Sequence, residues 1–353
     1  MTSNITKIII DPRCRINYSS YYIEGLKSLF GSRLIEFRCL QDIDTEPSGG
    51  MAVKIVVDGV EKCVFFDCWD GNNINEKMYQ WADAYGKVNL RHDDAHRDKI
   101  VPMGPNFGIG LWNPVTSILK GVKHHRIIKR HSGGNFKQPL KSFIRNYAYM
   151  FIRRKRYGYY HRFTDEEQPG YIFSLSTLWW GELSINTTNR YRGDFMRLCK
   201  QHMDVFEGGF YYVSNAEKES KVYSRYLEEY HDMIYKSRLS MTEYDKRNRK
   251  SWFVFSTPSV IGCLGWKLGE YLCEGKAIIS TPLNNVMPGN FENGVHYLEV
   301  KDTQEMEEAI VRLRDDADLV NRLKRNAWDY FNEWVSPEAS VRHVLARAGI
   351  VIP

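Results

Sequence analysis

The sequence predicts an α/β fold with two domains, each built from a series of βαβ units. Two runs of short apolar strands and amphipathic helices lie on either side of a polar, turn-prone segment at residues 165–170. The 353 residues supply enough material for two hydrophobic cores. We therefore expect an N-terminal domain at residues 1–168, a C-terminal domain at 169–336 and a final helical segment at 337–353.

The N-terminal series opens with a strand at residues 5–11, which Pro12 ends. A helix follows, because the apolar residues between 21 and 30 have helical spacing and Asn17 offers a cap. Asp58-Gly59 separates two apolar runs and predicts a β-hairpin. The elements expected from there on are strands at 53–57, 63–66 and 87–90, a helix at 75–84, and a glycine-rich loop at 103–110.

The C-terminal series repeats the alternation of strand and helix. Its expected elements are a strand at 171–175, a helix at 191–202, strand residues at 205 and 210–213, and helices at 219–236 and 240–250. Two more helices are expected at 303–314, with Thr303 as its cap, and at 317–334.

Residues 252–300 are the most informative stretch of the chain. A buried strand at 252–255 leads into a loop that contains Gly262 and Gly265, and a helix is expected at 266–274. Gly275 stands where a helix ends in a left-handed residue, and a second buried strand follows. The unpaired N–H groups and the dipole of a helix N-terminus attract anions, and Lys267 adds a positive charge in the first turn.

This stretch resembles the donor-site motif of the group 1, retaining branch of the GT-B glycosyltransferases. The matching residues, in an ungapped frame, are Pro258-Ser259, Gly265, Glu270, Gly275, Pro282 and Asn293-Gly294. The resemblance implies two Rossmann-like domains that face each other across a cleft, with the final helix crossing back toward the N-terminal domain. It also implies a transferase that uses a nucleotide-diphosphate sugar as donor substrate, without a cofactor or a metal ion.

The same resemblance assigns roles on the donor side. The expected donor-binding residues are Thr257, Gly265, Trp266, Lys267 and Glu270, and the expected catalytic residues are Arg190 and Lys267. Glu270 matches the family's second glutamate, which holds the donor ribose. The first glutamate of the family, which serves the transferred sugar, is replaced by Gly262. For Arg190, a surface arginine beside a helix cap is the alternative interpretation.

On the acceptor side we expect Arg15, Asp67 and Asp70. Arg15 follows the first strand, and the two aspartates follow a later strand at its carboxyl end, where open α/β sheets bind ligands. Two acids beside Trp69 suit contacts with a sugar, with one of them as a base. Turn and cap residues, or a solvated turn for Arg13 and Arg15, are the alternative interpretation.

One basic block dominates the charge distribution. Residues 120–163 carry 13 of the 49 Lys and Arg residues and no acid, and the remainder of the chain has 36 bases against 43 acids. Aromatic and aliphatic residues interleave with these bases, a composition typical of segments that bind anionic membrane surfaces. A solvated face and a nucleic-acid-binding surface are the alternatives, but no nucleic acid is expected as a partner because no recognisable binding fold accompanies the block.

The compartment is predicted from what the sequence contains. Seven cysteines without CxxC pairs indicate reduced thiols, and neither a signal peptide nor a stretch of roughly 18 apolar residues is found. We therefore expect a cytoplasmic protein, peripheral on the inner face of the plasma membrane. By analogy with the family, the expected acceptor is a bacterial surface glycan linked to a lipid diphosphate.

Other interpretations make different predictions. A GT-A transferase would hold a metal ion through Asp42-Ile43-Asp44, and His92 and His96 share the spacing of a zinc pair without a third ligand. The replacement of the first glutamate by Gly262 favours a catalytically inactive GT-B module that binds nucleotide or glycan. The basic block favours, more weakly, a nucleic-acid binder whose affinity depends steeply on salt.

Overall fold

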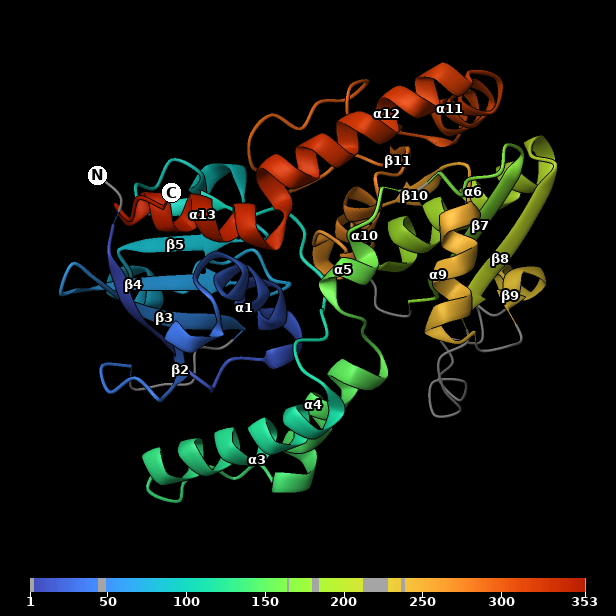
Figure 1. Cartoon of the computed structure of the whole chain (residues 1–353). Helices are drawn as coiled ribbons and strands as arrows, with labels where there is room; N and C mark the ends of the chain where they lie inside the picture. The colour runs from blue at the N-terminus through green and yellow to red at the C-terminus, as the bar shows by residue number, and fades with distance from the viewer. Residues whose placement is uncertain are drawn as a thin grey trace. The chain divides into compact units, whose positions relative to one another are not determined.

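Two α/β units make up the chain in the computed structural model, which describes residues 3–43, 49–163, 165–179, 184–211, 228–235 and 239–352 (Figure 1). Unit 1 comprises residues 1–161, 285–289 and 332–353, and unit 2 comprises residues 162–284 and 290–331. Both units contain parallel strand pairs covered by helices. The predicted α/β class is therefore confirmed.

Unit 1 is built on a six-stranded mixed sheet. Its strands are β1 (Ile5–Ile10), β2 (Ile35–Phe37), β3 (Gly50–Val57), β4 (Val60–Asp67), β5 (Ala84–Lys87) and β6 (Ile100–Pro102), in the order β2-β1-β3-β4-β5-β6. The predicted hairpin joins β3 and β4 in antiparallel register. Asp58 and Gly59 both have positive φ angles, of 50° and 81°, which is why Asp-Gly suits this two-residue turn.

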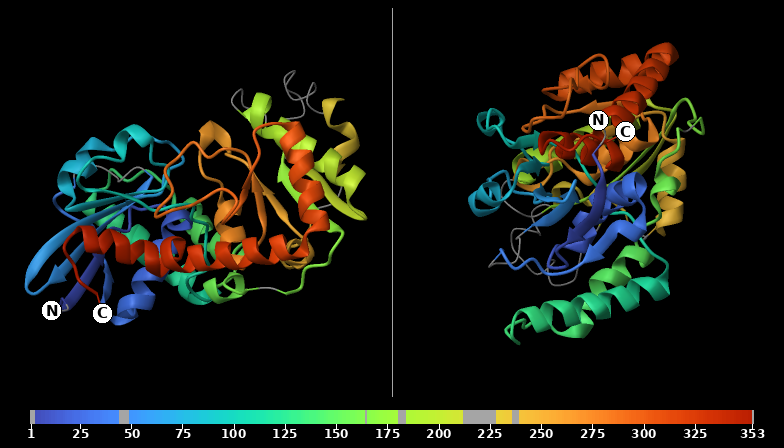
Figure 2. Two further views of the ribbon diagram at one scale, coloured as in Figure 1. Left: turned by 90° about the horizontal axis from the view of Figure 1, so that it is seen from above. Right: turned by 60° about the vertical axis from the view of Figure 1, so that its left-hand side comes forward.

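Helices flank this sheet. They are α1 (Ile16–Phe30), α2 (Glu76–Trp81), α3 (Pro114–His131), α4 (Leu140–Ile152), α5 (Tyr157–Tyr160) and α13 (Pro337–Arg347). The last helix, α13, packs on α1 and β5, and a Cβ atom on Gly25 would lie 2.0 Å from the carbonyl oxygen of Pro337. The two chain ends of unit 1 lie together (Figure 2), with the Ser3 amide donating to the Val351 carbonyl at 2.9 Å.

Unit 2 contains two three-stranded parallel sheets. The first consists of β7 (Tyr171–Thr177), β8 (Val205–Tyr211) and β9 (Ile234–Tyr235), and the second of β10 (Val254–Ser256), β11 (Ile278–Ser280) and β12 (Leu298–Glu299). The Trp252 amide donates to the Tyr171 carbonyl at 2.9 Å where the two sheets meet. Ile172, Phe195 and Ile279 belong to one core that spans both sheets.

The helices of unit 2 are α6 (Arg190–His202), α9 (Met241–Lys250), α10 (Trp266–Glu274), α11 (Thr303–Asp315) and α12 (Ala317–Tyr330). The short turns are η3 (Ser184–Asn189), η4 (His231–Met233) and η5 (Val260–Gly262), and the α12 helix continues into η6 (Phe331–Val335). Helix α10 spans the predicted residues 266–274, and Gly275 follows it in the left-handed conformation with φ 64°. The sequence signals for this helix are confirmed at both ends.

Three local predictions are wrong. The strand expected at 87–90 lies at Ala84–Lys87, where it pairs with both β4 and β6. Residues 231–235 of the expected helix 219–236 form η4 and β9, because Ile234 pairs with Phe210 at the sheet edge; residues 219–227 and 236 lie outside the described residues. Helix α11 is capped by Asp302, which accepts from the Glu305 amide at 2.8 Å, and not by Thr303.

The segment expected to link the domains is anchored in unit 2 by a buried carboxylate. Glu167, whose side chain is 2% exposed, accepts from Lys276 and from Lys324, each at 2.9 Å. Both lysines are buried, and Lys276 also donates to the Arg249 carbonyl at 2.6 Å. Burial raises the pKa of Glu167, but the two lysines more than offset this and leave the pKa below its usual value. The unit boundary therefore falls before this residue, after residue 161.

Replacing Glu167 by Gln should lower the free energy of unfolding by about 3–5 kcal/mol, because two buried ammonium groups lose their common counter-charge. Urea denaturation of the full chain measures the change. Glu166→Gln is the matched control, since Glu166 is exposed. Equal stability of the two variants would contradict the role assigned to the buried carboxylate.

Candidate functional site

The first turn of α10 lies at the carboxyl edge of the parallel strands of unit 2. The loop from β10 to α10 passes through Ile261 and Gly262, with φ angles of 55° and 74°. A β-branched residue in the left-handed region is strained, and such strain concentrates at binding sites. Gly265 precedes the helix and provides no side-chain cap for the first-turn N–H groups. The Leu268 amide donates to the Gly265 carbonyl at 3.0 Å, and the positive end of the helix dipole lies at this helix start.

Lys267 lies in this first turn with its ammonium group directed to the end of β7. Its Nζ donates to the Leu175 carbonyl at 2.5 Å and lies 3.3 Å from the Ser176 hydroxyl. Burial lowers the pKa of Lys267 to about 7, and the charge of Arg192 lowers it further while that of Glu270 opposes the change. The lysine is thus held in a site that disfavours its charge.

Arg192 is the functional candidate that the sequence interpretation missed. Its Nη1 donates to the Thr177 carbonyl at 3.0 Å, and burial lowers the pKa of its guanidinium to about 10. Arg190, two residues earlier, is exposed and places its guanidinium 5.0 Å from the centre of the Tyr191 ring. Both arginines lie in the first turn of α6. They differ in the direction in which they leave the helix: Arg192 faces the end of β7, whereas Arg190 faces solvent.

The other donor-side residues surround the same helix start. Thr257 follows β10 and is buried, and its hydroxyl accepts from that of Thr281 at 2.8 Å. Trp266 is the first residue of α10 and is half-buried. Glu270 lies one turn further along the same helix, also half-buried, and its charge adds to burial in raising the pKa of Tyr271. All the donor-side residues predicted from the sequence belong to unit 2.

This arrangement suits a diphosphate. Arg192 and Lys267 are two cations close enough for one to lower the pKa of the other, and they lie beside the positive end of a helix. A dianionic ligand would relieve their repulsion and accept N–H donors at the same time. The chemistry available here is electrostatic stabilisation of phosphate oxygens.

The acceptor-side residues lie together in unit 1. The Arg15 guanidinium stacks 4.6 Å from the centre of the exposed Trp69 ring. Asp70 accepts from the Tyr18 hydroxyl at 3.2 Å. Burial raises the pKa of Asp70, and the Tyr18 hydrogen bond and the Arg15 charge act in the opposite direction. A half-buried carboxylate beside an exposed indole and a cation is suited to hold a hydroxylated ligand.

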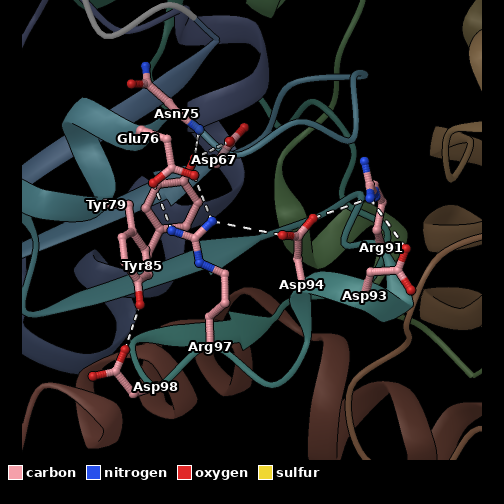
Figure 3. Close-up of polar contacts among 10 residues, drawn as sticks. All are labelled: Asp67, Asn75, Glu76, Tyr79, Tyr85, Arg91, Asp93, Asp94, Arg97 and Asp98. Carbon is pink, nitrogen blue, oxygen red and sulfur yellow. Dashed lines mark hydrogen bonds and ion pairs between the residues drawn. The ribbon is translucent and has the colours of Figure 1, made fainter.

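Asp67 lies behind this cluster in a buried network. It accepts from Lys87 at 3.0 Å. It also accepts from the hydroxyl of Tyr85, which in turn accepts from the Asn75 amide at 3.1 Å (Figure 3). Lys87 is fully buried, and burial also raises the pKa of Asp67. Through its Oδ1, Asp67 accepts from the Trp69 amide at 3.1 Å. Asp67 therefore positions Trp69, and Asp70 is the carboxylate nearer the surface.

Among the residues considered for metal binding, Asp42 has other partners. Asp42 accepts from the Trp81 indole at 2.9 Å and pairs with Lys54, and Asp44 lies outside the described residues. Asp93 and Asp94, beside His92, face Arg91 instead (Figure 3). Within the described ranges, no group of three or more His, Cys, Asp or Glu side chains is arranged to hold a metal ion.

The basic block forms the hairpin of α3 and α4, which is fixed to unit 1 by buried aromatic contacts. His124 of α3 and the Tyr147 hydroxyl of α4 lie 2.7 Å apart, which joins the two helices. The Phe37 ring of β2 packs on the His124 ring, with 4.3 Å between the ring centres, and connects the hairpin to the sheet. The outward faces carry exposed apolar residues and exposed bases. They are Val115, Leu119, Tyr149 and Ile152, and Lys123, Arg126, Lys129, Arg130, Lys141 and Arg145. In the described part of the chain, no helix is long and apolar enough to span a membrane.

Comparison with known proteins found distant structural likenesses. No family model and no curated protein matches the chain. Among solved structures, TarM is 13% identical over 53% of this chain, with a TM-score of 0.38. The C-terminal domain of LpcC, a group 1 glycosyl transferase from Francisella tularensis, is 14% identical over 46% of this chain and 84% of its own, with a TM-score of 0.33. Anabaena HepE in complex with UDP is 10% identical over 94% of this chain and 76% of its own, with a TM-score of 0.42.

The match spans 37% of the length of TarM. These likenesses concern the fold, so the functional argument rests on the residues of this chain.

The charge state of Lys267 gives a test of the anion site. Since its pKa is lowered from 10.5 to about 7, the group is partly neutral near neutral pH, and a bound diphosphate would favour its protonated form. UDP affinity should therefore fall by up to about tenfold per pH unit above pH 7. Arg192, Glu270 and the Tyr244 ring, 5.8 Å away, are the charged or titratable groups that face the lysine.

Calorimetric titration with UDP from about pH 6.5 to about pH 8.5 measures this dependence. Lys267→Met is the control, because the ionisation of UDP itself remains in that variant while the contribution of the lysine is removed. The same pH dependence in both proteins would exclude Lys267 from the anion site.

Proposed function

We propose that the protein is a glycosyltransferase that moves a sugar from a nucleotide-diphosphate sugar to a glycan acceptor. The single observation that carries the proposal is the pair of desolvated cations at the start of two helices, Arg192 on α6 and Lys267 on α10. The ungapped donor-site motif from Pro258 to Gly294 supports it.

In this reaction the difficult step is departure of the nucleoside diphosphate. Negative charge develops on the leaving phosphate oxygens, and groups already oriented toward them stabilise the transition state. Arg192, Lys267 and the first-turn N–H groups of α10 would do so, and Arg190 is a further candidate at the start of α6. Glu270 would accept hydrogen bonds from the ribose, and Thr257 and Trp266 would line the donor site. These groups would act without a metal ion.

Unit 1 would supply the acceptor side. Asp70 would accept a hydrogen bond from the attacking hydroxyl group, since its raised pKa brings it closer to the range of a general base. Arg15 and Trp69 would hold the acceptor by charge and by ring contact. Asp67 would contribute indirectly, because it accepts from the Trp69 amide and so positions that residue. For the acceptor itself we propose a surface glycan linked to a lipid diphosphate.

Replacing any one of Arg192, Lys267 and Glu270 by Ala should lower turnover. For the two cations the expected loss is about 10²–10³-fold, because stabilisation of the leaving group is lost. The assay is hydrolysis or transfer from a panel of UDP-, GDP-, TDP- and CMP-sugars, after thermal shift identifies the donor. Arg322→Ala, at an exposed arginine on α12, is the control. Nucleotide binding without turnover of any donor would favour the inactive module, and loss of activity in EDTA would favour a metal-dependent enzyme.

We further propose that the α3–α4 hairpin attaches the protein to the inner face of the plasma membrane. Exposed bases and apolar side chains on the same two helices fit an anionic lipid surface, to which each base contributes about 1 kcal/mol. Within 153–156, Arg156 donates to the Leu111 carbonyl and Arg154 is half-buried. The exposed bases of the helices are therefore the better probes of binding.

Changing Arg126, Lys129, Arg130, Lys141 and Arg145 together to Gln should weaken binding to vesicles containing phosphatidylserine by about a hundredfold or more, since several kcal/mol of attraction are lost. Co-sedimentation measures the affinity. The matched control removes five exposed bases elsewhere, at Lys77, Lys200, Lys246, Arg322 and Arg325. Equal weakening in both variants would show that only net charge matters and would refute attachment through the hairpin.

A further inference from the structure

A cavity with two lobes lies in unit 1 between the loop after β1 and the α3–α4 hairpin. One lobe has a volume of about 430 Å³ and the other about 510 Å³, both within the range of ligand pockets. The lobes share Arg13, Ile128, Phe136 and Gln138 as lining residues. The first lobe is bounded by residues 13–17, which follow the carboxyl end of a sheet strand, where α/β sheets place their ligands.

The lining offers hydrogen bonds that the protein does not use itself. Asn17 and Asn146 line the first lobe, Asn135 the second and Gln138 both. Within the described ranges, none of these four side-chain amides makes a hydrogen bond, whereas His125 uses only the backbone carbonyl of Gln138. Amides that can both donate and accept are suited to the hydroxyl groups of a sugar. Phe136 and Phe143 provide apolar surface for a sugar ring.

The charge of the lining is positive. Arg15 and Lys137 contribute cations, and none of the described residues that line either lobe is an acid. Arg13 adds little net charge, because its guanidinium pairs with buried Asp11 at 2.6 Å and also donates to the Leu40 carbonyl. Arg15 connects the cavity to the acceptor-side cluster, since the same guanidinium stacks on Trp69. A ligand with hydroxyl groups and a negative charge fits this combination.

We propose that this cavity binds a sugar phosphate, as the part of the acceptor that lies beyond the attacked hydroxyl group. The amides hold the sugar hydroxyls, and a cation in either lobe, Arg15 in the first or Lys137 in the second, attracts the phosphate. The inference names the acceptor class of the proposed transferase and rests on that proposal. The sugar phosphate is either a free molecule or the head of a lipid-linked glycan, and the chemistry of the lining is the same for both.

Calorimetric titration of the full chain with glucose 1-phosphate, glucose and inorganic phosphate tests the cavity. Glucose 1-phosphate should bind at least tenfold more tightly than either half alone. Asn146→Asp should weaken the binding of glucose 1-phosphate at least tenfold, because the amide donor is lost and the new carboxylate repels the phosphate. Asn17→Ala should weaken it by removing one amide. Asn321→Asp, at an exposed asparagine on α12, makes the same chemical change outside the cavity and should have no effect.

Titration with UDP on the same preparations separates the two proposals. Unchanged UDP affinity in Asn146→Asp shows that the variant is folded and that the effect is confined to the cavity. If glucose 1-phosphate fails to bind, or binds both Asn146→Asp and Asn17→Ala as it binds the original chain, the cavity inference is overturned while the transferase proposal stands. If no donor nucleotide binds, the transferase proposal fails on its own evidence.

Tighter binding of the decyl phosphodiester of glucose than of glucose 1-phosphate would identify a lipid-linked source of the sugar phosphate. Equal binding of the two would identify a free sugar phosphate.

Discussion

A carboxylate buried between two lysines is the constraint on which the site in unit 2 depends. Glu167 fixes the segment before β7 to Lys276, which lies between α10 and β11, and to Lys324 on α12. Lys276 also donates to the Arg249 carbonyl in the last turn of α9. Helix α10 ends at this point, at Gly275, where a Cβ atom would lie 2.7 Å from the Phe163 ring. These contacts fix the carboxyl end of α10 in unit 2, and the first turn of the same helix carries the proposed anion site.

The charges along α10 oppose its dipole. A helix favours acids near its N-terminus and bases near its C-terminus, whereas α10 carries Lys267 in the first turn and Glu274 in the last. Burial raises the pKa of Glu274 to about 7, although Lys276 and Arg249 act against the shift. The acid is thus compensated by neighbouring bases, but among the described residues only Glu270 offsets the effects of burial and of Arg192 on the pKa of Lys267. An electrostatically unfavourable helix start is consistent with a site that a bound anion completes.

Helix α10, its terminal glycine and the β3–β4 turn were predictable because each depends on local chemistry: apolar periodicity, a left-handed position and an Asp-Gly pair. The strand at 234–235 was not, because tertiary pairing with Phe210 prevailed over a helical pattern. In the site, Lys267 was named correctly as a first-turn residue, while Arg192 was missed, since its importance follows from burial beside Thr177. Asp67 and Asp70 look alike in sequence, and partners distant along the chain distinguish their environments: Lys87 and Tyr85 for Asp67, and Tyr18 for Asp70.

The replacement of the family's first glutamate by Gly262 changes the backbone as well as the side chain. Gly262 has a φ angle of 74°, and a Cβ atom there would lie 3.0 Å from the Asn284 side-chain amide. A carboxylate cannot simply be restored at this position, because any side chain would be strained and would meet Asn284. The groups proposed to stabilise a leaving diphosphate, Arg192, Lys267 and the start of α10, do not involve this position. In the proposed transferase, the absence of this glutamate would affect how the transferred sugar is held, whereas departure of the diphosphate would keep its electrostatic support. On this ground we favour an active transferase with altered sugar recognition over an inactive module.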